Sequence, residues 1–546
     1  MIMKKFILYT TFAAFGLMGI TTGCSDFGDT NLDPEHPSEA NMNYKMLFTG
    51  AQVQALGSDW DVWRNGCIYS STMMQHTTSV SWSQVFYTYS EGYNAAYWDA
   101  LYSGDRGVIR DIVDVLRNWK DLEGYENDYQ LARIMKSYMF HRMTDMYGDI
   151  PYSQAGQMKE GIAYPKYDRQ EDVYKGILEE LNDAQSKIDP SAGYQLGNAD
   201  IYFANGDTDS LKLEKWKKFA NSLILRAGMR LSKVNPAEAE KWVKTAVNNG
   251  IIDNQDDNAV LFRRDANVTN DSAEPYGKIF TQEDQQAFFL SEFFVNMLKD
   301  TNDPRLALIG IVTSNPAAKY TQLGYDRGNP DPAVQVGMPI GYDRQGGEFD
   351  LSKHPDYPGD NFRSHYSMPN RYTYADPQAP TMIVTYAENQ LLLAEAAYRG
   401  WLSGTSETKT AKEYYESGVR AAMKQFSLYS NASFIYSQYI TDSAINTYLR
   451  DNLFDINNAL EMINTQYYIT TFCDEYETFA NWRRSGYPVL TPVDKDYPNT
   501  ATNGTIPRRF TYPSSESQSN ATNYNEAVSR LKDGNTMTSR VWWDVE

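Results

Sequence analysis

The sequence predicts an all-α protein in which tetratricopeptide-like helix pairs support a loop-rich, aromatic binding face. Apolar residues recur at three-to-four-residue spacing in several long segments, as in helices that bury one stripe. These segments follow one another as pairs of near-equal length: 126–147 with 169–188, 211–232 with 236–249, and 384–400 with 407–427. Two other regions are rich in aromatic residues and have no such period. The pairing is typical of helical repeats, although no strict repeat length holds.

The first 23 residues have the features of a secretory signal. Lys4 and Lys5 are their only charges, and an apolar run and a short stretch of small residues follow. The apolar run is shorter than the roughly 20 residues of a membrane-spanning helix. Cys24 comes directly after Gly23, as in bacterial lipoproteins, whose signal is cut before a lipid-bearing cysteine, although Thr21 stands where Leu is commonest. An ordinary signal peptide with an incidental cysteine is the alternative.

We therefore expect residues 1–23 to be a lipoprotein signal peptide and Cys24 to be the lipidation site, which would anchor the chain to a membrane. Residues 24–43 are rich in Asp, Pro, Asn and Ser and poor in apolar groups, which predicts a flexible tether. The remainder, 44–546, is expected to form a single helical domain.

Charge and cysteine content exclude several classes of function. Removing residues 1–23 takes away two Lys and no acid, so the formal net charge changes from −20 to −22. Such a chain repels nucleic acid and anionic lipid. Once Cys24 is lipidated, only Cys67 and Cys473 remain, and they could form one disulfide or remain two buried thiols.

The two aromatic regions are the candidate binding face. Residues 60–102 contain eleven aromatics, and residues 310–380 contain seventeen Gly or Pro and seven Tyr. Aromatic faces cover the apolar C–H patches of sugars, while amides and carboxylates bind hydroxyls. Packing in the core is the alternative for each ring, and Tyr97, Trp98 and Tyr102 are expected there. The ligand-binding candidates are Trp60, Trp63, Trp82, Tyr87, Tyr89, Tyr342 and Tyr366.

Catalytic and metal-binding motifs are missing from the sequence. It contains no HExxH, GxSxG, Walker or GxGxxG motif, and its five His are scattered. The oxygen-rich run 254–258 lacks the spacing of an EF-hand and is interpreted as a solvated turn. We therefore expect no catalytic residue, no metal and no cofactor. A secreted glycoside hydrolase is the rival hypothesis, because a pair of carboxylates needs no motif, and a ligand-free helical scaffold is a third.

Several ordered motifs resemble those of the SusD/RagB family of Bacteroidota. They are TDMYGDIPYSQA (144–155), TYAENQLLLAEAAYRG (385–400), FANWRRSGYPVL (479–490), IPRRFTYPSSE (506–516), NYNEAV (523–528) and WWDV (542–545). The resemblance implies a helical lipoprotein of the cell outer membrane that faces the exterior. It also implies a SusC-like TonB-dependent transporter as partner, and capture of an oligosaccharide, or of an oligopeptide in some members, without catalysis.

The same motifs also have structural interpretations. Residues 146–151 have the form of a helix end, because Gly148 releases the backbone and Pro151 cannot continue a helix. Arg483 and Arg484 could hold an anionic ligand, but in a chain this acidic we expect them to pair with carboxylates of the protein.

Overall fold

The computed structural model describes residues 42–103, 107–203, 206–263 and 273–546. The expected signal peptide, Cys24 and nearly all of the expected tether lie outside these residues. Residues Lys45–Glu546 form one compact unit. Within the described part of the chain, no helix is both long and apolar enough to cross a membrane.

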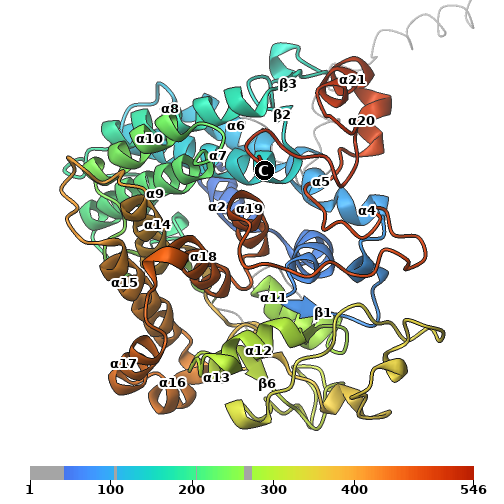
Figure 1. The fold of residues 1–546 in the computed structure, drawn as a ribbon. Helices are drawn as coiled ribbons and strands as arrows, with labels where there is room; N and C mark the ends of the chain where they lie inside the picture. The colour runs from blue at the N-terminus through green and yellow to red at the C-terminus, as the bar shows by residue number, and fades with distance from the viewer. Residues whose placement is uncertain (1–41, 104–106, 204–205, 264–272) are drawn as a thin grey trace, which may run out of the picture. The chain divides into compact units, whose positions relative to one another are not determined.

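The predicted all-α class is confirmed (Figure 1). The helices of the first half are α2 (Tyr44–Gln54), α3 (Asp59–Asp61), α4 (Glu91–Asn94), α5 (Ala96–Tyr102), α6 (Val108–Trp119), α7 (Glu126–Tyr147), α8 (Gln170–Lys187), α9 (Asp209–Arg230), α10 (Pro236–Asn249) and α11 (Pro275–Lys278). Those of the second half are α12 (Glu292–Asp300), α13 (Leu306–Ile309), α14 (Tyr386–Tyr398), α15 (Ala411–Lys424), α16 (Ser433–Tyr439), α17 (Asp442–Asp451), α18 (Ala459–Thr470), α19 (Glu475–Ser485), α20 (Ser514–Ser519) and α21 (Ala521–Ser529).

Helices α7 and α8, α9 and α10, and α14 and α15 pack as three pairs, as predicted. Their ends follow local chemistry. Thr385 and Thr410 each form a capping box with a Glu three residues later. Gly148 ends α7 with a φ of +85°. In the α14–α15 pair, a Cβ on Gly418 would lie 2.8 Å from Leu391, so the absence of a side chain there permits the close approach.

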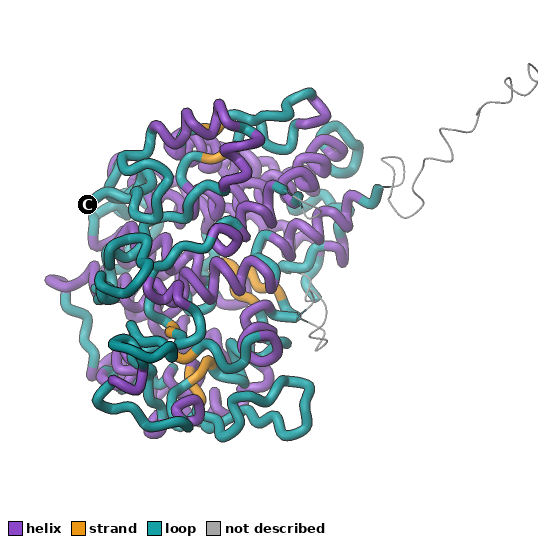
Figure 2. Tube along the Cα trace, turned by 90° about the vertical axis from the view of Figure 1, so that its right-hand side faces the viewer, coloured by secondary structure: helices purple, strands orange, loops and turns teal. Residues whose placement is uncertain are grey.

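The strands are short antiparallel pairs that join distant parts of the chain. They are β1 (Thr77–Thr78) with β5 (Phe289–Leu290), β2 (Ile150–Pro151) with β3 (Tyr167–Asp168), β4 (Ala259–Leu261) with β8 (Thr381–Val384), and β6 (Gly310–Ile311) with β7 (Met368–Pro369). Figure 2 shows the strands lying among helices and loops. Residues 310–380 have little regular structure, as predicted.

Residues 60–102 differ from the prediction. The sequence has no helical period in this region and was expected to form loops, but the structure is largely helical there. They include α4, α5 and a π-helical segment, Val62–Ser71, in which nine of ten residues are buried. A helix buried on all sides has no apolar stripe, and several of its buried residues are polar. The three-to-four-residue pattern is therefore absent from the sequence even though the helix forms.

A network of buried charges connects the helix pairs to α19. Arg484 on α19 binds both carboxylate oxygens of Glu395 on α14, at 2.7 and 2.8 Å. Arg226 and Arg230 on α9 pair with Glu388 on α14 and Glu477 on α19, at 2.5 and 2.6 Å. The expected structural role of Arg484 is confirmed. Arg483 differs from the expectation. It is buried between the rings of Phe479 and Trp543, and within the described residues it has no ion pair with a carboxylate; it donates instead to the backbone carbonyls of Phe479 and Arg508, at 3.1 and 3.0 Å.

The two remaining cysteines do not form a disulfide. Cys67 is fully buried and Cys473 partly buried, and both are free thiols. Burial raises the pKa of both well above the usual value, which makes them poor nucleophiles. In the run 254–258, Asp257 pairs with Lys218 at 2.6 Å, so this carboxylate serves as an ion-pair partner.

Candidate binding site

A large cavity lies where four segments meet, and its volume is about 1030 Å³. Residues from α3 and the start of the π-helical segment, from α5, from 279–283 and from α20 line it. Helices α5 and α20 lie on the same side of the molecule in Figure 1. We call this space the aromatic cavity; its lining side chains are Asp59, Trp60, Trp63, Ala96, Trp98, Asp99, Ala100, Ser103, Ile279, Glu283, Ser515, Glu516 and Ser519. Pockets for small ligands have volumes of roughly 300–1,000 Å³.

Trp60 is the most accessible aromatic ring of the cavity, with 55% of its surface exposed. The guanidinium of Arg64 lies over this ring and donates a hydrogen bond to the Trp60 carbonyl oxygen at 2.9 Å. Arg64 itself is buried. A cation over an exposed indole ring attracts it by about 0.5–1 kcal/mol, so Arg64 favours one orientation of the Trp60 ring although this ring is largely solvated.

Trp63 and Trp82 form a more buried aromatic pair near Trp60, since the guanidinium of Arg64 lies over the rings of both Trp60 and Trp63. Their rings meet edge to face at a centroid distance of 5.4 Å, and Tyr93 contacts both. Asp284 accepts the indole N–H of Trp63 at 3.2 Å and that of Trp82 at 2.7 Å. Burial raises the pKa of Asp284, and the two indole hydrogen bonds oppose that shift. One carboxylate from a distant segment therefore holds two of the predicted aromatic residues together.

The structure separates the other predicted residues from this group. Tyr87 is fully buried, with a φ of +61°. Tyr366 is buried and Tyr342 partly buried in a different apolar cluster, around Phe289. Tyr89 is 45% exposed, and its hydroxyl lies 3.4 Å from Thr511, shortly before α20. We leave Tyr87 and Tyr366 out of the proposed site, because neither offers a ring face to a ligand.

Sequence reasoning missed the acidic side chains of the cavity. Asp99, Glu283 and Glu516 lie on three segments that are far apart in the sequence. No local pattern marks them in a chain with 70 acids. Trp98 was expected in the core; it is 2% exposed and also lines the cavity.

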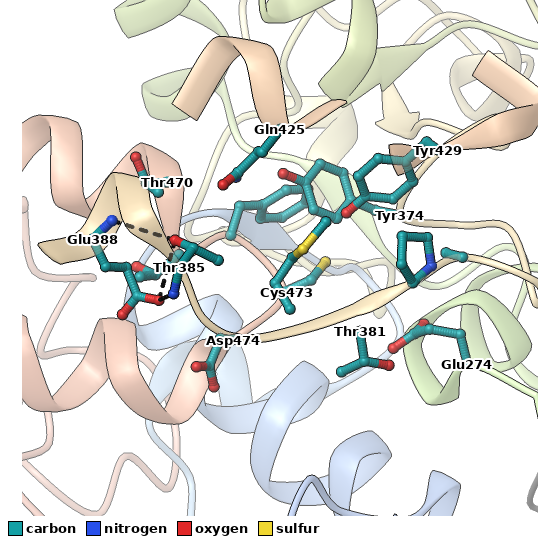
Figure 3. A pocket seen from close by; sticks show the side chains of 15 residues that line it. Glu274, Tyr374, Thr381, Thr385, Glu388, Gln425, Tyr429, Thr470, Cys473 and Asp474 are labelled. Atoms are coloured by element: carbon teal, nitrogen blue, oxygen red, sulfur yellow. Dashed lines mark hydrogen bonds between the residues drawn. The ribbon is translucent and has the colours of Figure 1, made fainter. Parts of the chain in front are cut away.

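A second, much smaller cavity lies in the interior beside Cys473 (Figure 3). Its volume is about 40 Å³, enough for one or a few water molecules but not for a sugar. Burial raises the pKa of Glu274, one of its lining residues, to about 7. Among the described residues, no group of three or more His, Cys, Asp or Glu is placed to hold a metal ion.

Comparisons with known proteins identify the family. A family model described as starch-binding and associating with the outer membrane matches residues 35–513. The chain is 29% identical to a solved chitin-binding protein (TM-score 0.75) and 27% identical to a Bacteroidetes AC2a SusD-like protein (TM-score 0.77). Each alignment covers 92% of this chain and 100% of the other.

A chitin-binding SusD homologue from Flavobacterium johnsoniae is 24% identical, with a TM-score of 0.70, and supports the fold alone. That alignment covers 92% of this chain and 99% of the homologue. No curated protein sequence gives a significant match. The resemblance drawn from the ordered motifs is therefore confirmed. The chain belongs to the SusD-like family of outer-membrane-associated proteins.

Proposed function

We propose that this chain binds an oligosaccharide at the cell surface and catalyses no reaction on it. The observation that carries the proposal is the exposed ring of Trp60, held by Arg64 at a cavity of about 1030 Å³. An indole ring covers the apolar C–H face of a sugar, and the hydroxyls and carboxylates of the lining are suitable partners for sugar hydroxyls. The description of the family as starch-binding supports the same class of ligand.

The leading class of ligand is an oligomer of an amino sugar, of which chitin, built from N-acetylglucosamine, is the first example to test. The support for this choice is the chitin-binding relative at 29% identity, which aligns over its whole length. An oligopeptide is the alternative ligand, because surfaces rich in Tyr and Trp also bind peptides. Titrating the protein with an oligosaccharide and, separately, with peptides distinguishes these two ligand classes.

Calorimetric titration with an N-acetylglucosamine hexamer tests the binding proposal. We expect a dissociation constant on the order of micromolar to millimolar, or about −8 to −4 kcal/mol. A ligand that is passed on to a transporter has to dissociate quickly. Because differences in affinity lie mostly in the off-rate, quick dissociation corresponds to modest affinity. The same mixture, incubated overnight and separated by chromatography, should contain only intact hexamer. Cleavage of the hexamer in proportion to added protein would contradict the absence of catalysis. If the protein bound peptides but no glycan, an oligopeptide would replace the oligosaccharide as the proposed ligand.

We further propose that Cys24 carries a lipid and that a SusC-like TonB-dependent transporter receives the ligand. The position of Cys24 after an apolar run supports the anchor, and family membership supports the transporter. A lipidated cysteine with two or more acyl chains binds a membrane stably. Co-purification of a barrel protein from native membranes tests the partner, and its absence in mild detergent counts against this assignment.

Replacing Cys24 with Ser should release the exported protein from the membrane fraction. The substitution removes the thiol that accepts the lipid and leaves all residues of the described fold unchanged. Phase partitioning in detergent and fractionation of whole cells measure the effect, with Cys67→Ser as a thiol control that should remain anchored. If Cys24→Ser stays membrane-bound as fully as the unaltered protein, the lipid assignment is wrong.

A further inference from the structure

The charged side chains that line the aromatic cavity are all acidic. They are Asp59, Asp99, Glu283 and Glu516. Among the described residues, no Lys, Arg or His lines this cavity. A ligand that enters the cavity therefore meets aromatic rings and negative charge together.

In the part of the chain that the structure describes, one of these four carboxylates has a basic partner. Lys278 pairs with Asp59 at 2.5 Å. Arg64, the other nearby cation, is buried over the rings of Trp60 and Trp63 and does not line the cavity. The remaining carboxylates have neutral partners or none: Ser103 donates to Asp99 at 3.2 Å and Tyr167 donates to Glu516 at 2.7 Å.

The pKa values of Asp99 and Glu516 are raised, as expected for carboxyl groups near other negative charges. Partial desolvation of the carboxyl group at the cavity wall is the main cause that raises the pKa of Asp99, although the residue as a whole is exposed. The nearby charge of Glu91 adds to the shift. Burial likewise raises the pKa of Glu516, and repulsion from Asp99 contributes. A cationic group in the cavity would relieve this repulsion and stabilise the charged form of both.

We infer that the aromatic cavity prefers oligosaccharides with free ammonium groups, such as glucosamine oligomers, over acetylated ones and excludes those with carboxylates. This inference rests on the proposed function, because it assumes that the same cavity holds the sugar. The pyranose rings of glucosamine and N-acetylglucosamine present the same apolar faces to Trp60. Their nitrogen substituents differ, and the ammonium group of glucosamine is attracted to carboxylates and to the face of an indole ring.

The test is a calorimetric comparison of three hexamers in a mildly acidic buffer: glucosamine, N-acetylglucosamine and galacturonate. At low ionic strength, we expect glucosamine to bind about tenfold more tightly than N-acetylglucosamine, equal to about 1.4 kcal/mol, and galacturonate not to bind. In about 0.5 M salt the ratio should fall toward one, because the attraction is screened. Equal affinities for the two amino sugars at low salt would overturn the inference and leave the proposed function intact. Failure of all three hexamers to bind would instead count against the proposed function.

Two variants assign the preference to the cavity. Asp99 and Glu283 are exposed, so the double variant Asp99→Asn/Glu283→Gln should fold normally. It should lose most of the tenfold preference, because the amides of Asn and Gln still hydrogen-bond sugar hydroxyls but carry no charge. The affinity for the glucosamine hexamer should therefore fall more than that for the N-acetylglucosamine hexamer. Glu214→Gln, an equally exposed acid on α9, outside the cavity lining, is the matched control and should keep the preference. The inference would be contradicted if the double variant kept the preference for the glucosamine hexamer. It would also be contradicted if a hexamer of lysine bound as tightly as the glucosamine hexamer, because the whole acidic surface would then attract any cation.

Discussion

Replacing Glu395 with Ala should lower the free energy of unfolding by about 3–5 kcal/mol. Arg484 donates two hydrogen bonds to this carboxylate, and Arg399 donates another at 2.9 Å. The side chains of Arg484 and Glu395 are 2% and 1% exposed. Removing the carboxylate leaves a guanidinium buried without its anion, and desolvation of that charge is the origin of the loss.

Urea unfolding followed by circular dichroism measures this loss. The matched control is Glu240→Ala on α10, because Glu240 also pairs with a basic side chain, Lys244, at 2.8 Å, but at the surface. Exposed pairs of this kind contribute at most about 1 kcal/mol. A loss for Glu395→Ala no larger than that of the control would contradict the structural role that we assign to the network.

The same carboxylate should make stability depend on pH in the acid range. Burial opposes ionisation of Glu395, but the guanidinium of Arg484 outweighs it and lowers the pKa from 4.5 to about 2. The folded protein therefore holds the proton less tightly than the unfolded chain. The contribution is complete above about pH 4.5 and is lost as the pH falls toward about 2. In Glu395→Ala this part of the acid dependence should be absent.

Helix pairing was predictable from the sequence because apolar residues recur at three-to-four-residue spacing in the paired helices. This holds for α10, which buries one stripe, and also for α7, in which eighteen of 22 residues are buried. The apolar spacing placed 126–147 and 236–249 nearly where α7 and α10 occur. The π-helical segment 62–71 was not predictable in this way, because it is buried all round and carries polar residues such as Asn65 and Ser70. Apolar spacing is visible only where the buried positions hold apolar residues, so a buried helix with polar residues at these positions has no such signal.

The ordered motifs identify the family, and several of their charged residues lie in the interior. Glu516 is an exception, because it lines the aromatic cavity. Glu388, Glu395 and Arg484 belong to two of the motifs, and all are buried in ion pairs. The sequence indicates a structural role for the arginine of this group, Arg484, in ion pairs with carboxylates of the protein. The individual partners of these three residues depend on how α9, α14 and α19 pack, and no local spacing specifies that packing.

The candidate binding site was predictable from the sequence only in its aromatic part. Trp60, Trp63 and Trp82 are close in sequence and converge in space. Asp284, which holds two of them, and Glu516, which lines the cavity, come from segments more than 200 residues away. Density of aromatic residues also does not separate exposed rings from buried ones, which is why Tyr87 and Tyr366 were included among the candidates.

Replacing Trp60 with Ala should weaken binding of the N-acetylglucosamine hexamer roughly 5- to 30-fold, or by about 1–2 kcal/mol. The ring is more than half exposed, so its loss removes contact area for the sugar without leaving a buried cavity. Stability in urea should change by less than about 0.5 kcal/mol, as for surface substitutions in general. Tyr164→Ala is the matched control, because Tyr164 is an exposed aromatic residue, 68% accessible, that does not line the cavity.

The central claim is that an oligosaccharide binds against Trp60 in the aromatic cavity, and its most direct test is the affinity of three proteins for one ligand. Calorimetry with the N-acetylglucosamine hexamer compares the unaltered protein, Trp60→Ala and Tyr164→Ala under identical conditions. We predict measurable binding by the unaltered protein, the same affinity for Tyr164→Ala, and the 5- to 30-fold loss for Trp60→Ala. Equal affinity of Trp60→Ala and the unaltered protein would contradict the claim that this cavity is the binding site.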